Sequence, residues 1–181
     1  MPSNTIGQVR DLYLNQFRQV LASTPNAHLE PALRNSNGEL ALDGSLQLPY
    51  RADVIPRGGS GSIMVDSPTR ASIPSETQSI AGVLVTINSF FWDQARFELS
   101  GLAQEADWSP LRTWFLRWFD GEDSNQVNEE GFYGVVHCAL DPEATSDGYG
   151  VTIDFGSAPI DAFVECLEAL AVLRPQQIEV V

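Results

Sequence analysis

Three stretches of this chain carry apolar residues at the spacing of a helix. In residues 5–22, 108–119 and 158–173, apolar side chains recur at every third or fourth position, so each stretch has one apolar face. Pro110 and Pro159 fit the first turns of the second and third stretches, where a missing amide hydrogen needs no partner. We therefore predict three amphipathic helices that pack on a common core.

Other stretches have the alternation of strands. In residues 39–50, leucines alternate with polar residues on either side of Asp43-Gly44, which predicts a hairpin with a tight turn. Five further strands are predicted, at residues 80–92, 94–102, 131–140, 148–156 and 177–181. The first two of these five are so close in sequence that we expect them to form a hairpin, and the next two form a second pair.

Together these elements predict an α+β fold in which helices pack on one face of an antiparallel-rich sheet. Residues 80–181 have the order β-β-α-β-β-α-β. Without its first strand this is the ferredoxin-like order, and the alternative is a duplicated ββα unit. Residues 56–79 are rich in Gly, Ser and Pro and are expected to form a loop or linker. They separate the N-terminal helix and hairpin in residues 1–55, expected to be part of the same fold, from the main α+β domain in residues 80–181.

One of the predicted helices is unusually aromatic. Leu111, Trp114, Phe115 and Trp118 follow one another at helical spacing and share a face, with Phe119 at its margin. We predict that this face closes the core, because aromatic side chains bury large apolar surfaces. The stripe is broad, so one or two rings are expected to reach the surface, where Trp is a common interface anchor.

The charge of the chain is strongly negative and unevenly placed. The net charge is −14, and residues 105–181 hold 15 of the 24 acidic residues but three of the ten basic ones. Such a field repels the phosphate backbone, so we expect no direct binding of nucleic acid. It attracts a basic protein partner, although solubility alone also favours an acidic surface.

An acidic run, "DGEDSNQVNEE", follows the aromatic helix directly, and we predict an exposed loop there. The run lacks the ligand spacing of an EF-hand calcium loop. The loop and the helix before it supply the predicted partner-binding residues, with Trp118 as an anchor beside the charges. The acidic members of this set are Asp120, Glu122, Asp123, Glu129 and Glu130.

Catalytic and metal-binding motifs have little support in the sequence. There is no lysine, which excludes Schiff-base, P-loop and kinase lysines. His28, His137, Cys138 and Cys166 lack the spacing of a metal motif, so we expect no metal site and no cofactor. The cysteines lie in apolar runs and are predicted to be free and buried. His137 is predicted to be a hydrogen-bonded or half-exposed strand histidine whose neighbour Cys138 points to the opposite face.

The chain begins without the pattern of a signal peptide and contains no apolar stretch of membrane-spanning length. We therefore expect a cytoplasmic protein that does not enter membranes. Its oligomeric state is left open.

In general character the chain is similar to bacterial toxin-immunity proteins, which are short, acidic, α+β and without catalytic motifs. The resemblance implies a non-catalytic binding module that neutralises a basic toxin or effector by direct contact, and not an enzyme. Two alternatives stay open. One is an enzyme or small-ligand-binding protein with a pocket near the Gly/Ser loop, using His137 and Arg57. The other is a structural subunit of a larger assembly.

Overall fold

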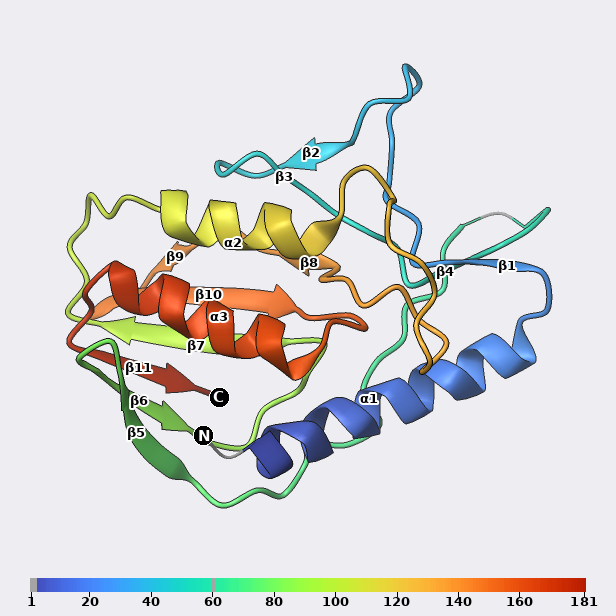
Figure 1. Cartoon of the computed structure of the whole chain (residues 1–181). Helices are drawn as coiled ribbons and strands as arrows, with labels where there is room; N and C mark the ends of the chain where they lie inside the picture. Colours follow the sequence, from blue (N-terminus) through green and yellow to red (C-terminus); the bar gives the residue numbers. More distant parts are fainter. Residues whose placement is uncertain (1–2, 60) are drawn as a thin grey trace.

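The computed structural model describes residues 3–59 and 61–181, in which three helices and eleven strands form an α+β fold (Figure 1). The helices are α1 (Ser3–Ser23), α2 (Ser109–Phe119) and α3 (Ile160–Val172). The strands are β1 (Ala27–Leu29), β2 (Leu42–Asp43), β3 (Leu48–Pro49), β4 (Val54–Pro56), β5 (Glu76–Ile80), β6 (Val83–Ile87), β7 (Ala95–Ser100), β8 (Cys138–Ala139), β9 (Glu143–Ala144), β10 (Gly148–Asp154) and β11 (Gln177–Val180). The three predicted helices and the predicted fold class are confirmed.

The main sheet has the strand order β5-β6-β11-β7-β10-β8, and β9 pairs with the start of β10. β11 runs parallel to β6, and the other neighbours in this sheet are antiparallel. Within the sheet, the succession β7-α2-β8-β10-α3-β11 gives the order β11-β7-β10-β8, with the first strand of the unit in a central position. This is the ferredoxin-like arrangement of two interleaved βαβ units, rather than a duplicated ββα unit.

The hairpin predicted between residues 80–92 and 94–102 is wrong. These stretches contain β6 and β7, but β11 lies between the two strands and pairs with both. β6 forms its hairpin with β5 instead. Residues 88–94 connect β6 to β7 and bury Phe90 and Trp92, which made the connection resemble a continued strand. Apolar alternation shows which face of a strand is buried, but not which strand lies next to it.

The strand predicted at 131–140 is also wrong for most of its length, because only β8 at Cys138–Ala139 is extended and paired. Gly131 and Gly134 have positive φ angles of 91° and 71°, which break the extended backbone. The backbone amides of residues 135–137, which precede β8, donate to acceptors in different parts of the chain. The amide of Val136, for example, donates to the carbonyl of Trp118 at 3.0 Å.

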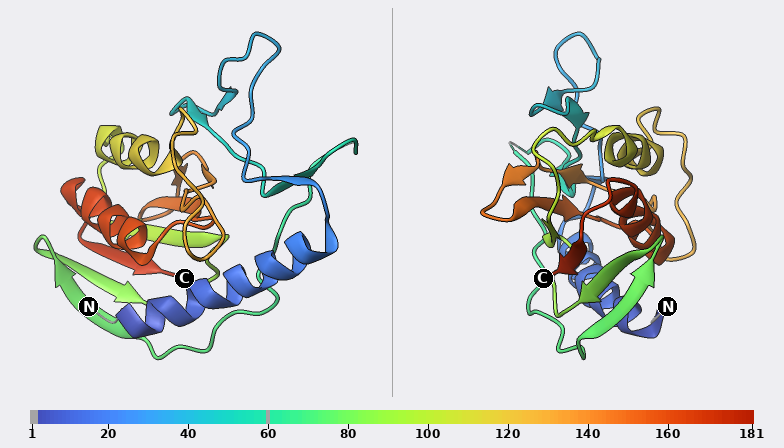
Figure 2. Two further views of the ribbon diagram at one scale, coloured as in Figure 1. Left: turned by 45° about the vertical axis from the view of Figure 1, so that its right-hand side comes forward. Right: turned by 90° about the vertical axis from the view of Figure 1, so that its left-hand side faces the viewer.

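The hairpin predicted at 39–50 is confirmed, but its tight turn is not. Asp43 belongs to β2 and pairs with Leu48 of β3, so the loop comprises residues 44–47. The Asp141 carboxylate holds this wider loop by accepting hydrogen bonds from the amides of Ser45 and Leu46. A contact from a residue so distant in sequence is not visible in the local turn pattern. The loop that leads into β2 projects from the body of the molecule (Figure 2).

Helices α2 and α3 cover one face of the main sheet (Figure 2), and the opposite face is partly exposed. α1 lies beside α3, and Thr5 of α1 donates to Glu76 of β5 at 3.4 Å. Phe163 of α3 is the centre of an aromatic core between the layers. Its ring centroid lies 5.2 to 5.9 Å from four other aromatic rings, those of Phe90, Trp92, Phe97 and Phe155. Two of these contacts are stacked and two are tilted, and aromatic pairs of this kind stabilise a core beyond the area they bury.

The aromatic face of α2 is buried, with one change from the predicted stripe. Phe119 is fully buried, while Trp118 is half-buried at the side of the helix. The ring of Phe119 stacks on Phe115 at 5.4 Å, and the Arg51 guanidinium lies 4.7 Å from its centroid. Helical spacing alone predicted Phe119 at the margin of the apolar face. The contact that covers its ring comes from Arg51, which lies outside the helix and is not part of that spacing.

Candidate functional site

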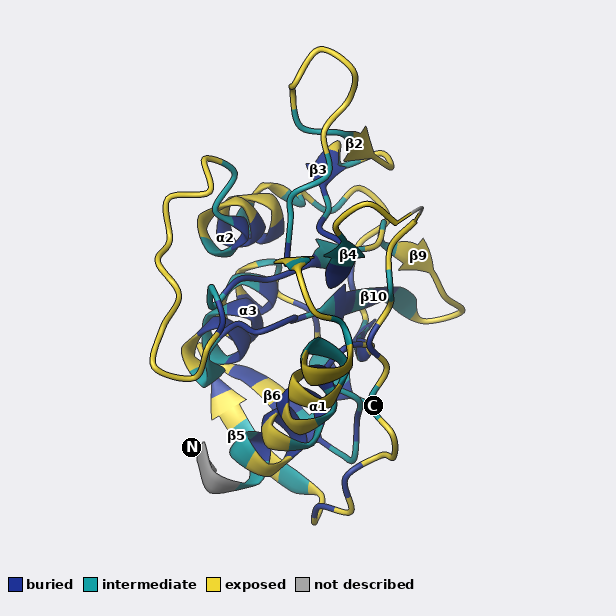
Figure 3. Cartoon of the chain, turned by 90° about the vertical axis from the view of Figure 1, so that its right-hand side faces the viewer, coloured by how far each residue is buried: buried dark blue, intermediate teal, exposed yellow. Residues whose placement is uncertain are grey.

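The acidic segment after α2 runs along the outside of the molecule, and residues 122–131 are exposed (Figure 3). Asp120 ends the helix with a positive φ of 53°. Its carboxylate accepts hydrogen bonds from the amides of Ser124 and Asn125, at 3.1 and 2.8 Å. Burial opposes ionisation of Asp120, but a hydrogen bond from the Ser124 hydroxyl, these amide hydrogen bonds and the charge of Arg51 hold its pKa below the ordinary value. The first turn of the segment is therefore ordered by its own side chain.

Arginines from other parts of the chain hold the same segment by ion pairs. Asp123 lies 3.1 Å from Arg34 and 3.0 Å from Arg51. Glu130 accepts two hydrogen bonds from Arg10 of α1, at 2.9 and 2.5 Å, and the Arg10 guanidinium holds the pKa of Glu130 below its usual range. The segment is thus fixed at both ends and bridges α2 and α1 (Figure 1).

The other predicted contact residues have different surroundings. Glu122 and Glu129 are exposed, and among the described residues neither has an ion pair or a side-chain hydrogen bond. Trp118 donates through Nε1 to Glu165 of α3 at 2.8 Å, and the Arg117 guanidinium lies 5.6 Å from its ring centroid. The acids therefore share one loop, whereas Trp118 belongs to the boundary between α2 and α3.

A groove of about 740 Å³ lies between the acidic segment and the region of β1. One wall consists of residues 27–32, and the other includes Asp123 and residues 125–127. Val127 is 51% exposed and offers an apolar contact beside the charges. The groove beside the acidic segment is therefore large enough to accept a side chain of a partner.

A second cluster of charged groups is buried around His137, which is 1% exposed. Its Nδ1 lies 2.6 Å from Oδ1 of Asp53, and its Nε2 lies 2.8 Å from Oε1 of Glu30. Oδ2 of Asp154 is 3.7 Å from the same Nδ1. The Tyr13 hydroxyl of α1 also donates to Asp53, at 3.4 Å. The acids stand at strand ends: Glu30 follows β1, Asp53 precedes β4, and Asp154 is the last residue of β10.

The surrounding carboxylates determine the protonation state of His137. Burial lowers its pKa, but Asp154, Asp53 and Glu30 together outweigh burial and raise that pKa to about 10. Burial raises the pKa of Asp154 to about 7, against the opposing effect of His137. With both ring nitrogens protonated, His137 donates to a carboxylate on each side. In this state it has no lone pair with which to act as a general base.

Glu30 is also held by several hydrogen bonds. Its carboxylate accepts hydrogen bonds from the amides of Tyr133 and Ser157, at 2.9 and 3.3 Å. Its carbonyl accepts a hydrogen bond from Arg51 at 2.6 Å. These contacts stabilise its backbone at a positive φ of 47°, which a residue with a side chain seldom adopts.

The prediction for His137 is confirmed in its hydrogen bonding and wrong in its secondary structure, since the residue precedes β8. Its partners Glu30 and Asp53 lie 107 and 84 residues away and were not identified from sequence. A histidine inside the apolar run "VVHCAL" indicates a buried ring that needs partners. The run itself does not indicate which residues they are.

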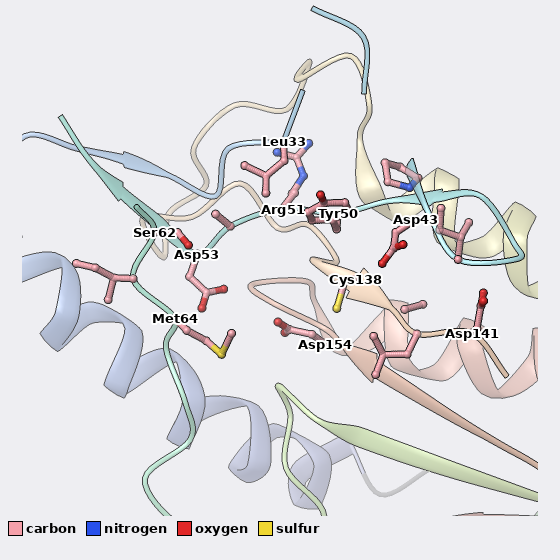
Figure 4. A pocket seen from close by; sticks show the side chains of 17 residues that line it. Leu33, Asp43, Tyr50, Arg51, Asp53, Ser62, Met64, Cys138, Asp141 and Asp154 are labelled. Atoms are coloured by element: carbon pink, nitrogen blue, oxygen red, sulfur yellow. The ribbon is translucent and has the colours of Figure 1, made fainter. Parts of the chain in front are cut away.

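Asp53 and Asp154 also line a cavity of about 610 Å³ (Figure 4). Ser62, Ile63 and Met64, at the end of the Gly/Ser loop, line it as well, together with Cys138. Both cysteines are free, as predicted, but Cys138 is only half-buried. Burial and the charge of Asp154 raise the pKa of the Cys138 thiol to about 12, so it stays protonated at neutral pH. The cavity therefore combines an apolar wall with carboxylates.

In the described part of the chain, no helix has both the length and the apolar character needed to cross a membrane. No protein-family model matches the sequence, and neither a curated protein nor a solved structure is significantly similar to it.

Proposed function

We propose that this protein is a non-catalytic binding module whose acidic segment, residues 120–130, binds a basic protein. A concrete form is an immunity protein that neutralises a toxin or effector by direct contact. The proposal rests on one observation, that ion pairs with arginines hold this exposed segment in place. Arginines of the chain neutralise and hold Asp123 and Glu130, while Glu122 and Glu129 remain exposed on an ordered backbone.

An ordered acidic segment favours binding for two reasons. A loop that is already fixed loses little conformational freedom when a partner docks, so more of the interaction energy appears as affinity. Exposed charges of one sign also accelerate encounters with a surface of the opposite sign. The net charge of −14 extends this attraction beyond the segment itself.

The test is a capture experiment with matched charge variants. The wild-type chain is used to recover a partner from its native host, and association rates are then measured at several salt concentrations. In the double variant Glu122→Gln/Glu129→Gln, we expect association at low salt to slow by about tenfold and to depend less on salt. The control Glu105→Gln/Glu168→Gln removes the same charge from exposed positions elsewhere. Equal rates for the two double variants would reject the segment as the binding surface.

The cavity at Asp53 and Asp154 favours a second candidate, the binding of a small molecule. Its volume of about 610 Å³ is within the range of ligand sites, and it combines apolar walls with a few polar groups. Native mass spectrometry of the purified protein tests for a retained ligand. A bound species that disappears in the cavity-filling variant Ala139→Trp supports this candidate, and a spectrum of the bare chain alone counts against it.

A further inference from the structure

The ring nitrogen Nδ1 of the buried His137 lies beside Asp53 and Asp154, two carboxylates that line the cavity of about 610 Å³. Nδ1 lies 2.6 Å from Oδ1 of Asp53 and 3.7 Å from Oδ2 of Asp154, and one ligand atom from each of the three residues lies within 4.8 Å of the other two. We propose that Asp53, His137 and Asp154 form a binding site for a divalent first-row transition-metal ion, with Zn²⁺ as the best fit. The site is separate from the acidic segment, and its existence does not depend on the proposed partner.

Glu30 prepares His137 for this role as a positioning residue. It accepts the hydrogen bond from Nε2 at 2.8 Å and is itself held by the amides of Tyr133 and Ser157. Histidines that bind metals usually donate their second N–H to a carboxylate or a carbonyl, which fixes the ring and its tautomer. With Nε2–H directed to Glu30, the nitrogen that faces Asp53 and Asp154 is the one left to bind an ion.

The balance of charge in the cluster also favours a dication. Glu30, Asp53 and Asp154 supply three carboxylates, and the His137 ring is the group among them that carries positive charge. The Arg51 guanidinium, though near, is directed to the carbonyls of Glu30, Phe119 and Asp120. When a divalent ion binds, the Nδ1 proton leaves to solvent, so the exchange of one proton for two positive charges brings the buried cluster closer to neutrality.

The geometry needs only a small adjustment. Bonds from zinc to nitrogen and oxygen are about 2.0–2.2 Å, which places two ligand atoms of a tetrahedron about 3.4 Å apart. The separation between Nδ1 and Asp154 is already 3.7 Å. The separation between Nδ1 and Asp53 must open from 2.6 Å, because a proton now joins these two atoms. The cavity provides access for the ion and space for a water molecule as the fourth ligand.

The chemistry of the donor set selects the kind of ion. An imidazole with two carboxylates suits zinc and its first-row neighbours, whereas Ca²⁺ and Mg²⁺ prefer a shell of oxygen atoms alone. Cys138 lines the same cavity, but its thiol is not needed for this donor set. The expected ion is therefore bound by nitrogen and oxygen without a thiolate.

Titration with Co²⁺ tests the proposal, because this ion substitutes for Zn²⁺ and its visible absorption reports its ligands. The purified full-length protein is titrated at pH 8 while absorption is recorded, and Zn²⁺ is then added as a competitor. We expect one equivalent of Co²⁺ to bind, with visible bands of a low-symmetry site, no sulfur charge-transfer band, and displacement by Zn²⁺. One proton should be released for each ion bound.

Two variants locate the ion. Asp154→Asn keeps a side-chain oxygen that can accept the hydrogen bond from Gly156 but loses the charge, and it should weaken Co²⁺ binding by at least about tenfold. Circular dichroism verifies that this variant is folded. His28→Gln removes the other histidine, which is exposed in β1, and should leave binding unchanged. The proposal is overturned if the wild-type chain binds no stoichiometric Co²⁺ at millimolar concentration, if folded Asp154→Asn binds like the wild type, or if His28→Gln abolishes binding.

Discussion

Gly156 lies directly against the imidazole ring of His137. A β-carbon at position 156 would stand 2.6 Å from Cγ of the ring and closer still to Cδ2 and Nε2. The residue also has a positive φ of 50°. The glycine therefore provides both the space and the backbone conformation that the buried ring requires.

Replacing Gly156 with alanine should destabilise the protein by about 1–3 kcal/mol beyond the cost of the backbone conformation alone. The added methyl group must displace a ring that is hydrogen-bonded on both sides. Gly38→Ala is the matched control, because Gly38 has a φ of 82° and nothing within 4 Å of its would-be β-carbon. Urea denaturation of both variants separates the two costs. Equal midpoints would show that the ring can move aside freely.

Removing the Glu30 side chain should have a larger effect. Glu30→Ala leaves the His137 imidazolium without one of its buried partners, and breaking a buried ion pair from one side costs about 3–5 kcal/mol. Glu122→Ala removes an exposed carboxylate and should change stability by no more than about 0.5 kcal/mol. The free energy of unfolding from chemical denaturation checks both values. A small effect of Glu30→Ala would mean that solvent reaches the ring.

The ion pair between Arg10 and Glu130 should give a specific dependence of stability on pH. Arg10 lowers the pKa of Glu130 below 4.5, so the pair stabilises the folded state above that pH and its contribution is lost as pH falls through the lowered pKa. The Glu130 side chain is 39% exposed, so screening limits the effect to about 1 kcal/mol or less.

This dependence is measured by the free energy of unfolding between pH 7 and pH 3. Glu130→Gln should be less stable than the wild type at pH 7, and the two should converge as the solution becomes acidic. Glu129→Gln, at the neighbouring exposed position, should follow the wild-type curve throughout. A constant difference between wild type and Glu130→Gln down to pH 3 would contradict the assignment.

Phe119 should contribute more to stability than Trp118, although tryptophan is the larger side chain. Phe119 is fully buried, and truncating such a residue to alanine costs about 3–5 kcal/mol. Trp118 is half-buried, so Trp118→Ala should cost less than Phe119→Ala. Thermal and chemical denaturation of the two variants measure the difference. The reverse order would place Trp118, not Phe119, on the principal buried face of α2.

The helices could be predicted from the sequence more reliably than the pairing of the strands. The apolar stripes of α1, α2 and α3 extend over three turns or more, so the helical period is evident. The pairing of β6 with β11 is not evident in the same way. Val85 and Ile178 are matched in register across the sheet, yet alternation in each strand is compatible with many partners.

The two candidate sites also differ in how far local sequence could predict them. The acidic segment is continuous in sequence, so its exposure and its position after α2 could be predicted. The His137 cluster draws Glu30, Asp53 and Asp154 from three separate segments, two of them loop ends without a periodic pattern. Tertiary structure brings these groups together, and motif spacing therefore gave no indication of this cluster.

The position of β11 determines when the main sheet can be completed during folding. β11 is the final strand in chain order, but it lies inside the sheet, between β6 and β7. Until residues 177–180 leave the ribosome and insert there, the β5-β6 hairpin and the strands around β7 are two half-sheets, each with an unpaired edge. Such edges readily pair with other chains. The sheet is therefore complete only when residues 177–180 are in place, and without them β6 and β7 keep edges that can pair with other chains.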